Sequence, residues 1–410
     1  MGEYYDALET RGADERAAAI AERLPAQLAH AKRNTLYFAR TLADVDCEAI
    51  TTREALASLP VLRKSDLMAL QKQDPPFGGL NATPLADLSR VLISPGPIFE
   101  PEGRGGDFYR FARALFAAGV RAGDLVYNTF AYHLTPGGWI GQTAANALGC
   151  PVIPAGVGNT DQQLDAIAAL RPVAYVGTPA FLKVLLDKAE ETGSDVSSIV
   201  RAMVSGGALP PSLRDELQAR GVFVRQSYGT ADLGLIAYES EAMEGMIADE
   251  GALIEIVRPG TGEPVPDGEV GEVVVTVFNP DYPLVRFATG DLSAVLPGIS
   301  PCGRTNLRIV GWMGRADQTT KVKGMFVHPS QLDEVAKRHP EILKARLEVT
   351  GEKGMDAMTL VVETVGGDAP VEAIRDSLSA VTKMRGEVRI VTQGSLPNDG
   401  KVIDDQRNYE

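Results

Sequence analysis

Between Val91 and Phe223, short β-branched and apolar runs alternate with segments of helical pattern, and this alternation restricts the fold more than any other feature. The expected strands are Leu125–Phe130, Pro151–Pro154, Val173–Gly177, Ile199–Val204 and Val222–Gln226, and helices are expected at 136–148, at 160–170, after Thr178 and up to Leu217. Strands that alternate with helices at this spacing indicate βαβ units and a parallel sheet covered by helices. Ligands of such sheets bind at the carboxyl ends of the strands.

Local signals accompany three of the expected helices. Thr160 is followed three residues later by Gln163, which is the spacing of a capping box. Thr178 stands directly before Pro179, which predicts an N-cap with proline at the first helical position. Upstream, the alanine-rich segment 13–33 is helical in pattern, and we expect its internal proline to split or kink the helix.

The pattern changes in the second half of the chain. Two strand-like runs, 252–257 and 272–278, flank a cluster of proline and glycine residues that is typical of turns. This arrangement predicts a β-rich subdomain over about 235–312.

Strands and helices alternate again beyond Arg315. The clearest strands of this last segment are 343–350, 358–364 and 387–391. We therefore expect an α/β protein with a large N-terminal domain over 1–314 and a small α+β domain over 315–410.

The composition argues against several classes of partner. With 410 residues, of which 44% are hydrophobic and 23% charged, the chain resembles an ordinary globular protein of more than one domain. The formal net charge of −14 argues against a nucleic acid or an anionic membrane as partner. Three widely spaced cysteines imply no disulfide framework. Since we see neither a signal segment nor an apolar run of membrane-spanning length, we expect a cytoplasmic protein.

Two glycine-containing corners suggest a ligand with hydroxyl and phosphate groups. They are Thr289-Gly290-Asp291 and Gly314-Arg315-Ala316-Asp317. A carboxylate can accept hydrogen bonds from a diol, and a guanidinium can donate two parallel bonds to phosphate oxygens. A Gly-Asp sequence also forms ordinary turns, so the corners alone do not decide the function.

These corners resemble the RTGDL and GRxDD segments of adenylate-forming enzymes, and the following run FVHPSQLDEV resembles a segment of the phenylacetate–CoA ligase family. Further segments match that family in order and at compatible spacing: GGWIGQTAANALGCPVIPAGVGNT at 137–160, VSGGALPP at 204–211, YGTAD at 228–232 and GSLPNDGK at 394–401. The resemblance covers nearly the whole chain from about Leu88. It implies the adenylate-forming fold, in which the small C-terminal domain is a mobile lid.

The resemblance implies an AMP-forming acyl–CoA ligase. Such an enzyme uses ATP and magnesium to convert a small carboxylic acid into an acyl-adenylate, and then passes the acyl group to the thiol of coenzyme A. The family places its acyl pocket at Tyr132, His133, Trp139, Gly156 and Val157, which allows an aromatic or branched acid. His133 could contact the substrate carboxylate or act as a base, or it could be a structural histidine that caps a helix start.

The resemblance also implies residues that contact the nucleotide. In Ser205-Gly206-Gly207-Ala208, small side chains let the backbone and the flat adenine ring approach closely, although the segment could equally be an ordinary strand-to-helix turn. Within YGTAD, Tyr228 could stack on adenine and Thr230 could bond phosphate, with Gly229 between them.

The remaining implied residues belong to the corners and the lid. Asp291 fits the ribose diol, and Arg315 fits the ribose or a phosphate. Asp317 matches the hinge about which the lid rotates. Lys401 matches the lysine that stabilises the transferring charge during adenylation. Without the resemblance, Lys401 is simply a solvated lysine near a terminus.

The phosphate-binding loop departs from the family pattern. Where the family has SSGTTGKP, this chain has SPGPIFEP at 94–101, so prolines remove backbone donors, both threonines are lost and a glutamate replaces the lysine. A phosphate loop depends on those amide and hydroxyl donors. Arg104, which lies between glycines just downstream, could supply a substitute.

The metal-binding residues also differ. The acidic residue that helps to hold magnesium in the family is Asp232 here, and its shorter arm suggests coordination through water. Of the zinc site found in some relatives only Cys302 is present, and the other expected ligands are replaced by Ser240, Met246 and Ser300. One thiolate cannot form a tetrahedral structural site, so we expect no zinc.

Two alternatives to a CoA ligase stay open. The acyl acceptor could be an amine, a hydroxyl or a carrier protein instead of coenzyme A. The chain could also be a binding protein that keeps the nucleotide pocket without turnover, which the altered loop favours and the retained Asp291, Arg315, Asp317 and Lys401 disfavour. Relatives often form homodimers, but no sequence patch predicts a homodimer here.

Overall fold

The computed structural model describes residues 3–207, 209–316, 320–322, 325–327, 329–352, 355–364, 370–397 and 401–407. The chain divides into two compact units. The first comprises Met1–Glu269, Val273–Thr289 and Ser293–Trp312, and the second comprises Val270–Glu272, Gly290–Leu292 and Met313–Glu410. Each unit has a hydrophobic core of its own.

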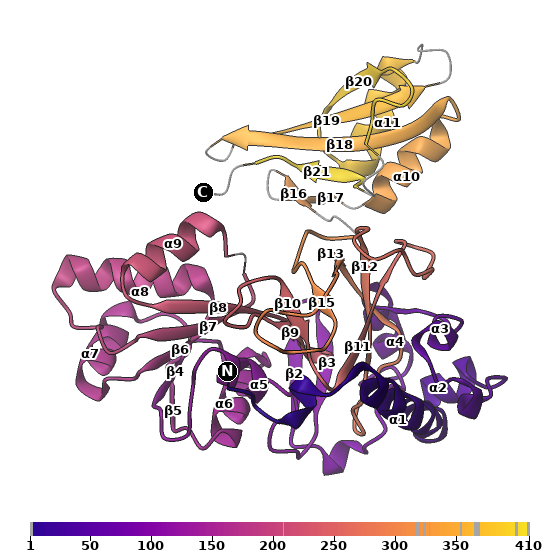
Figure 1. The fold of residues 1–410 in the computed structure, drawn as a ribbon. Helices are drawn as coiled ribbons and strands as arrows, with labels where there is room; N and C mark the ends of the chain where they lie inside the picture. The colour runs from indigo at the N-terminus through magenta and orange to yellow at the C-terminus, as the bar shows by residue number, and fades with distance from the viewer. Residues whose placement is uncertain are drawn as a thin grey trace. The chain divides into compact units, whose positions relative to one another are not determined.

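A nine-stranded mixed sheet belongs to the first unit, in the order β14-β15-β10-β9-β8-β7-β6-β4-β5 (Figure 1). Strands β5, β4, β6, β7 and β8 are parallel, whereas β8, β9, β10, β15 and β14 pair antiparallel. Their bounds are β4 Val126–Asn128, β5 Val152–Pro154, β6 Ala174–Gly177, β7 Arg201–Val204, β8 Phe223–Thr230, β9 Gly234–Tyr238, β10 Met246–Ala248, β14 Val295–Leu296 and β15 Arg308–Ile309.

Helices cover both faces of the parallel strands. Along β6, Ala174 and Val176 pack in a cluster with α5 and α6, while Tyr175 between them packs in a cluster with α7, α8 and α9 (Figure 1). The bounds are α5 Ala112–Ala117, α6 Gly137–Ala147, α7 Thr160–Leu170, α8 Pro179–Thr192 and α9 Pro211–Ala219. The predicted parallel, helix-covered sheet is therefore confirmed.

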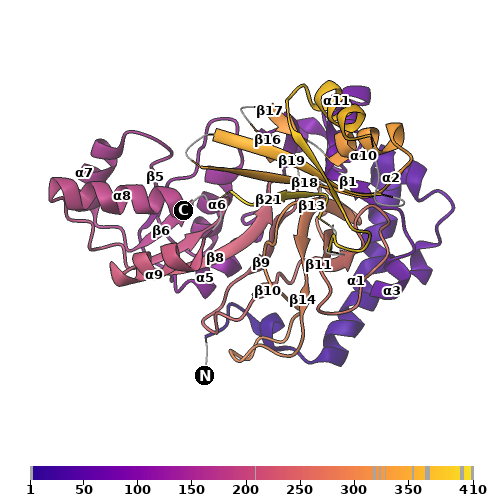
Figure 2. The ribbon, with the colours of Figure 1, turned by 90° about the horizontal axis from the view of Figure 1, so that it is seen from above.

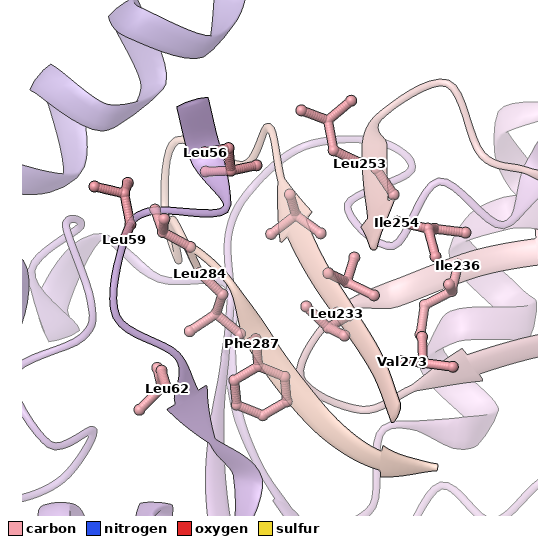
Figure 3. Packing of buried hydrophobic residues seen from close by; sticks show 14 of the residues in the cluster. Leu56, Leu59, Leu62, Leu233, Ile236, Leu253, Ile254, Val273, Leu284 and Phe287 are labelled. Carbon is pink, nitrogen blue, oxygen red and sulfur yellow. The ribbon is translucent and has the colours of Figure 1, made fainter. Parts of the chain in front are cut away.

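A second sheet has the order β1-β13-β12-β11, and it belongs to the first unit except for residues 271–272 of β12 and Gly290–Leu292 of β13. Leucine and phenylalanine side chains from β1 and β13 meet side chains from β9, β11 and β12 in one apolar cluster (Figure 3). Figure 2 shows the N-terminal helices α1–α3 on the opposite side of this unit from α7 and α8. The bounds are β1 Leu62–Arg63, β11 Ala252–Val257, β12 Gly271–Val277, β13 Phe287–Ser293, α1 Ala13–Asn34, α2 Leu36–Thr41, α3 Arg53–Leu56 and α4 Leu67–Gln73, with 3-10 helices at Ala7–Thr10, Cys47–Ala49, Lys64–Asp66 and Leu85–Asp87.

The predicted helix signals had mixed outcomes. Thr178 caps α8 as expected, because its side chain accepts a bond from the amide of Phe181 at 3.2 Å. The capping box at Thr160 was wrong. The N-cap is Asn159, in the left-handed region at φ 52°, and Gln163 instead bonds loop carbonyls. The first helix is not split, since α1 continues through its buried proline, and the alternative of a kink stays a prediction.

The second unit contains a hairpin and a four-stranded sheet of order β20-β19-β18-β21. Helices α10 and α11 share one apolar cluster with β18 and β19, so both pack on this sheet. The expected strands are present. The bounds are β16 Thr320–Val322, β17 Met325–Val327, α10 Pro329–Arg338, β18 Ile342–Glu352, β19 Met355–Thr364, α11 Val371–Thr382, β20 Glu387–Val391 and β21 Ile403–Asp405.

Candidate active site

The glycine loop, Ser205–Gly207, follows β7 at the carboxyl end of the parallel strands. The amide of Ser205 donates to the carbonyl of Gly177 at 3.1 Å, and its hydroxyl donates to the carbonyl of Ser227 at 3.0 Å. These bonds attach the start of the loop to β6 and β8, the two neighbours of β7. Ala208, the last predicted residue of this loop, lies outside the described residues.

The two glycines of this loop present bare backbone. Gly206 has φ +69°, in a region that side-chain-bearing residues rarely adopt. A Cβ atom added to Gly206 would lie 3.5 Å from the ring of Phe130, and one added to Gly207 would lie 3.6 Å from Pro179. Both glycines are exposed. The loop therefore offers a surface on which a flat ligand can approach the backbone.

Tyr228, near the end of β8, is held by a chain of hydrogen bonds. Its hydroxyl donates to Oγ1 of Thr289 at 3.2 Å, and Thr289 donates to the carbonyl of Val273 at 3.1 Å. The ring packs in the core cluster with Leu233 and Ile236, and 8% of its surface is exposed. The bonds fix this ring against β12 and β13, while its stacking on adenine stays a prediction.

The polar side chains of the turn between β8 and β9 bond to other groups of this protein. Oγ1 of Thr230 accepts a bond from the amide of Leu233 at 3.2 Å. Asp232 is buried and forms an ion pair with Lys64, the first residue of the 3-10 helix after β1. Gly229 allows the strands to approach, because an added Cβ atom would lie 2.6 Å from a backbone oxygen of β9.

In the second unit, the two predicted corners come together. Asp291 and Arg315 form an antiparallel β-bridge, and the amide of Leu292 donates to the carbonyl of Gly314 at 2.9 Å. The guanidinium of Arg315 donates to Oδ1 of Asp291 at 3.2 Å. An acceptor for hydroxyl groups thus lies beside a donor for phosphate oxygens. Asp317, the predicted hinge, lies outside the described residues.

The segment expected to form a phosphate loop is a β-hairpin. Strand β2 (Arg90–Ser94) pairs antiparallel with β3 (Ile98–Glu102), with Ser94 opposite Ile98. Only Pro95–Pro97 connect them, so residues 98–101 belong to a strand and not to a loop. Because two of the three connecting residues are prolines, this hairpin turn has a single backbone N–H group. A cradle of successive amide donors cannot form there.

Neighbouring elements fix the hairpin and leave Arg104 outside it. Gln71 of α4 bonds both backbone groups of Phe99 in β3, at 2.8 Å each. Arg104 is exposed, and its guanidinium approaches the carbonyl of Ala86 at 3.4 Å. Its proposed role as a substitute phosphate ligand therefore stays a prediction.

A buried charge cluster, which was not predicted from the sequence, is formed by Lys64, Glu100, Asp232 and Tyr282. Ser94 donates to Oε1 of Glu100 at 2.6 Å. Oε2 of Glu100, Oδ1 of Asp232 and the Tyr282 hydroxyl expose less than 1 Å² each and have no hydrogen-bond partner within the described ranges. Burial, and then the charge of Asp232, raise the pKa of Glu100 well above its usual range. Burial and the same two carboxyl groups raise the pKa of Tyr282.

This cluster does not fit a magnesium ion. Magnesium takes oxygen ligands in octahedral geometry and usually keeps several waters. The free oxygens of Glu100 and Asp232 are too buried to share a hydrated ion, and Lys64 already neutralises Asp232. We therefore assign no step of a reaction to a metal at Asp232.

Two residues of the predicted acyl pocket lie together beyond β4. The rings of Tyr132 and Trp139 meet edge to face, with centroids 5.3 Å apart, and the guanidinium of Arg90 lies 3.9 Å from the Trp139 ring. Asn128, the buried last residue of β4, donates to the Tyr132 hydroxyl and to the carbonyl of Gly138, at 2.8 Å each. Asn128 was missed, although a polar residue at the end of a buried strand was the available signal.

Of the other predicted pocket residues, one lies with this group and two are exposed. The amide of Gly156 donates to the carbonyl of Asn128 at 3.1 Å, which places it in the same group. His133 and Val157 are exposed. The alternative in which His133 caps a helix start is wrong, because α6 has Pro136 at its N-cap and no side-chain capping bond.

Lys401 lies in the second unit with 43% of its side chain exposed. Its ammonium is 3.5 Å from Oδ1 of Asp404. An exposed contact of this length contributes little stability, so the side chain can leave it at small cost. Its catalytic role stays a prediction.

Cys302 is engaged with polar neighbours. Its sulfur lies 3.1 Å from Oγ of Ser300 and 3.5 Å from the guanidinium of Arg304. Across the described ranges, no group of three or more His, Cys, Asp or Glu residues could hold a metal ion. The expectation of no zinc remains a prediction. None of the described helices combines the length and the apolar character needed to cross a membrane.

Comparison with known proteins places these features in a family. Residues 135–277 match the model of the AMP-binding enzymes. The phenylacetate–coenzyme A ligase of Thermus thermophilus is 31% identical over 88% of this chain and 84% of its own length. The enzyme of the same name from Aromatoleum evansii is 30% identical, over 87% of this chain and 83% of its own.

A solved structure supports the same placement. A 2-hydroxyisobutyryl-CoA ligase, in complex with 2-HIB-AMP and CoA, superposes with a TM-score of 0.73. It is 25% identical, and the match covers 98% of this chain and 91% of that one. The predicted adenylate-forming fold is therefore confirmed.

Proposed function

The chain belongs to the phenylacetate–coenzyme A ligase family of AMP-binding enzymes, and we propose that it is an AMP-forming ligase that joins a small carboxylic acid to coenzyme A. ATP supplies the AMP group of an acyl-adenylate, and coenzyme A accepts the acyl group. The observation that carries the proposal is the glycine loop, whose exposed backbone lies at the carboxyl ends of the parallel strands. That edge is where sheets of this kind bind their ligands.

In the first half-reaction, a carboxylate oxygen attacks the α-phosphorus of ATP in line, and pyrophosphate leaves. The glycine loop accommodates adenine, Asp291 accepts bonds from the ribose hydroxyls, and Arg315 donates to phosphate oxygens. The ammonium of Lys401 stabilises the negative charge that moves from the carboxylate to the leaving pyrophosphate. Magnesium bound to the phosphates of ATP would neutralise part of their charge, and we assign it no ligand among the residues of this chain.

In the second half-reaction, the thiolate of coenzyme A attacks the acyl carbonyl and AMP leaves. The acid is proposed to lie beside Tyr132 and Trp139, whose edge-to-face pair is partly buried. The apolar rings suit an aromatic or branched acid. Asn128 positions Tyr132 and is not expected to react.

The test is pyrophosphate release from ATP and magnesium with a panel of small carboxylic acids. We expect acid-dependent release by the wild type and a loss of about 100-fold or more for Lys401→Ala, because one charge-stabilising group contributes roughly 10²–10³ in rate. Lys337→Ala, which removes an exposed lysine of α10, is the control. Equal release by the wild type and Lys401→Ala would contradict the role of Lys401.

Product analysis separates the open alternatives. Acyl-CoA and AMP in equal amounts support the ligase, whereas release that depends on an amine, a hydroxyl compound or a carrier protein supports another acceptor. AMP binding without pyrophosphate release supports a binding protein, which the hairpin turn favours because it cannot cradle a triphosphate. The cytoplasmic location and the absence of nucleic-acid and membrane partners stay predictions, and the oligomeric state stays open.

A further inference from the structure

The carboxylate of Asp232 already has a cation beside it. Lys64 forms an ion pair with Oδ2 of Asp232, whose side chain is completely buried, while 23% of the Lys64 side chain is exposed. Lys64 directly follows β1, and β1 pairs in register with β13 at Leu62–Phe287 and Arg63–Ala288. The strand pairing of a sheet therefore sets the position of the ammonium beside Asp232, and not a mobile surface segment.

The other side of Asp232 is occupied by a second acid. Glu100 lies within hydrogen-bonding reach of Asp232, and its Oε1 is fixed by the hydroxyl of Ser94 at 2.6 Å. The ammonium of Lys64 on one side and the carboxyl group of Glu100 on the other thus enclose the carboxylate of Asp232.

The ammonium of Lys64 already neutralises the carboxylate of Asp232. A metal at Asp232 would have to displace this ammonium from the ion pair. It would also need water ligands, although the facing oxygens expose less than 1 Å² each. Glu100 is the third residue of β3, so the altered turn and the acid beside Asp232 belong to one hairpin.

We propose that Lys64 is a built-in cation that replaces the divalent metal ion at Asp232, so that this chain binds an adenylate without a metal at that residue. The proposal concerns cation binding by the first unit. It holds whichever acid or acceptor the enzyme uses.

The test is a titration of the full chain with Mn²⁺, with and without AMP, in which electron paramagnetic resonance reports the free ion. We expect the wild type and Asp232→Asn to bind Mn²⁺ equally poorly. Lys64→Met keeps the length of the side chain and removes its charge, so it should gain affinity by about tenfold or more, equivalent to about 1.4 kcal/mol. Lys72→Met, on the exposed face of α4, should behave like the wild type.

Two results would overturn the proposal. One is a wild type that binds Mn²⁺ tightly and loses it in Asp232→Asn, and the other is a folded Lys64→Met that gains no affinity. Should Lys64→Met fail to fold, the comparison of the wild type with Asp232→Asn decides alone. Calorimetry with AMP gives a second readout, since its affinity should be equal in magnesium and in EDTA. Neither measurement uses turnover, so a failed ligase assay and a failed cation assignment are distinguishable.

Discussion

The glycine loop and the hairpin turn both belong to the first unit, and for both segments the family resemblance predicts contacts with a nucleotide. The glycine loop keeps small residues and exposed backbone at the end of β7. The hairpin turn, Pro95–Pro97, has lost the amide and hydroxyl donors, and the acid that follows it in β3 is buried against Asp232. One segment matches the family sequence in its small residues, and the other departs from it.

On the proposed function, we expect the difference to decide which part of the nucleotide the chain contacts. The adenosine and the α-phosphate stay bound through both proposed half-reactions, whereas the two outer phosphates leave after the first. A glycine loop therefore serves the whole cycle, and a phosphate loop serves only its start. On the proposed function, we expect the altered turn to weaken contacts to the outer phosphates and to leave the adenylate contacts intact.

The largest expected effect concerns the cluster behind the hairpin. Lys64→Ala leaves Asp232 and Glu100 buried without their cation, and we expect a loss of about 3 kcal/mol in the free energy of unfolding. Urea denaturation measures it. Lys72→Ala is the control and should change stability by less than about 0.5 kcal/mol. An unchanged midpoint for Lys64→Ala would show that the ion pair does not hold this region together.

The next effect tests the glycine loop. Gly206→Val puts a branched side chain at a positive φ and against the ring of Phe130, so AMP affinity should fall by about tenfold or more, which is about 1.4 kcal/mol. Calorimetric titration with AMP measures this change. Gly193→Val is the matched control, because Gly193 has the same φ of +69° and nothing within 4 Å of an added Cβ atom. Equal affinities in both variants would remove the glycine loop from the nucleotide site.

Glu100→Gln should stabilise the protein by about 1–2 kcal/mol, because the amide can donate to the unpaired oxygen of Asp232 and still accept from Ser94. The pKa of Glu100 is raised on folding, so its contribution to stability is full below the unfolded pKa and is lost as the pH rises through the folded pKa. The gain from the substitution should therefore be larger near pH 8 than near pH 5. Thermal unfolding at both pH values checks this, and a gain that falls with pH would contradict the assignment.

The smallest expected effect belongs to Tyr228. Tyr228→Phe removes the bond to Thr289 and keeps the ring, so unfolding should cost about 1 kcal/mol less while AMP affinity changes by less than about threefold. Comparing the two quantities separates a structural hydroxyl from a ligand-binding one. A large loss of affinity with unchanged stability would assign the hydroxyl to the nucleotide.

The parallel sheet and its helices could be predicted because each strand and helix carries its own periodic pattern. The pairing of Asp291 with Arg315 could be anticipated only through the family resemblance, because no local sequence signal indicates that two corners far apart in the chain will pair. The hairpin was harder to predict, because an altered phosphate loop and a hairpin turn look alike in a sequence until the strand register is known.

The buried charge cluster could not be predicted for a related reason. Lys64 precedes a short helix like many solvated lysines, and only the pairing of β1 with β13 delivers it to Asp232. Glu100 alternates with apolar residues in a strand, which gives no sign that its carboxyl group is buried. Long-range contacts between single charged side chains leave no periodic trace in a sequence.

The most direct test of this account is a calorimetric titration of the full chain with AMP, carried out in magnesium and again in EDTA. We predict saturable binding of equal affinity in both buffers, because we propose that the glycine loop holds the adenylate and that Lys64 replaces a metal at Asp232. No binding of AMP in either buffer, or binding that disappears in EDTA, would contradict it.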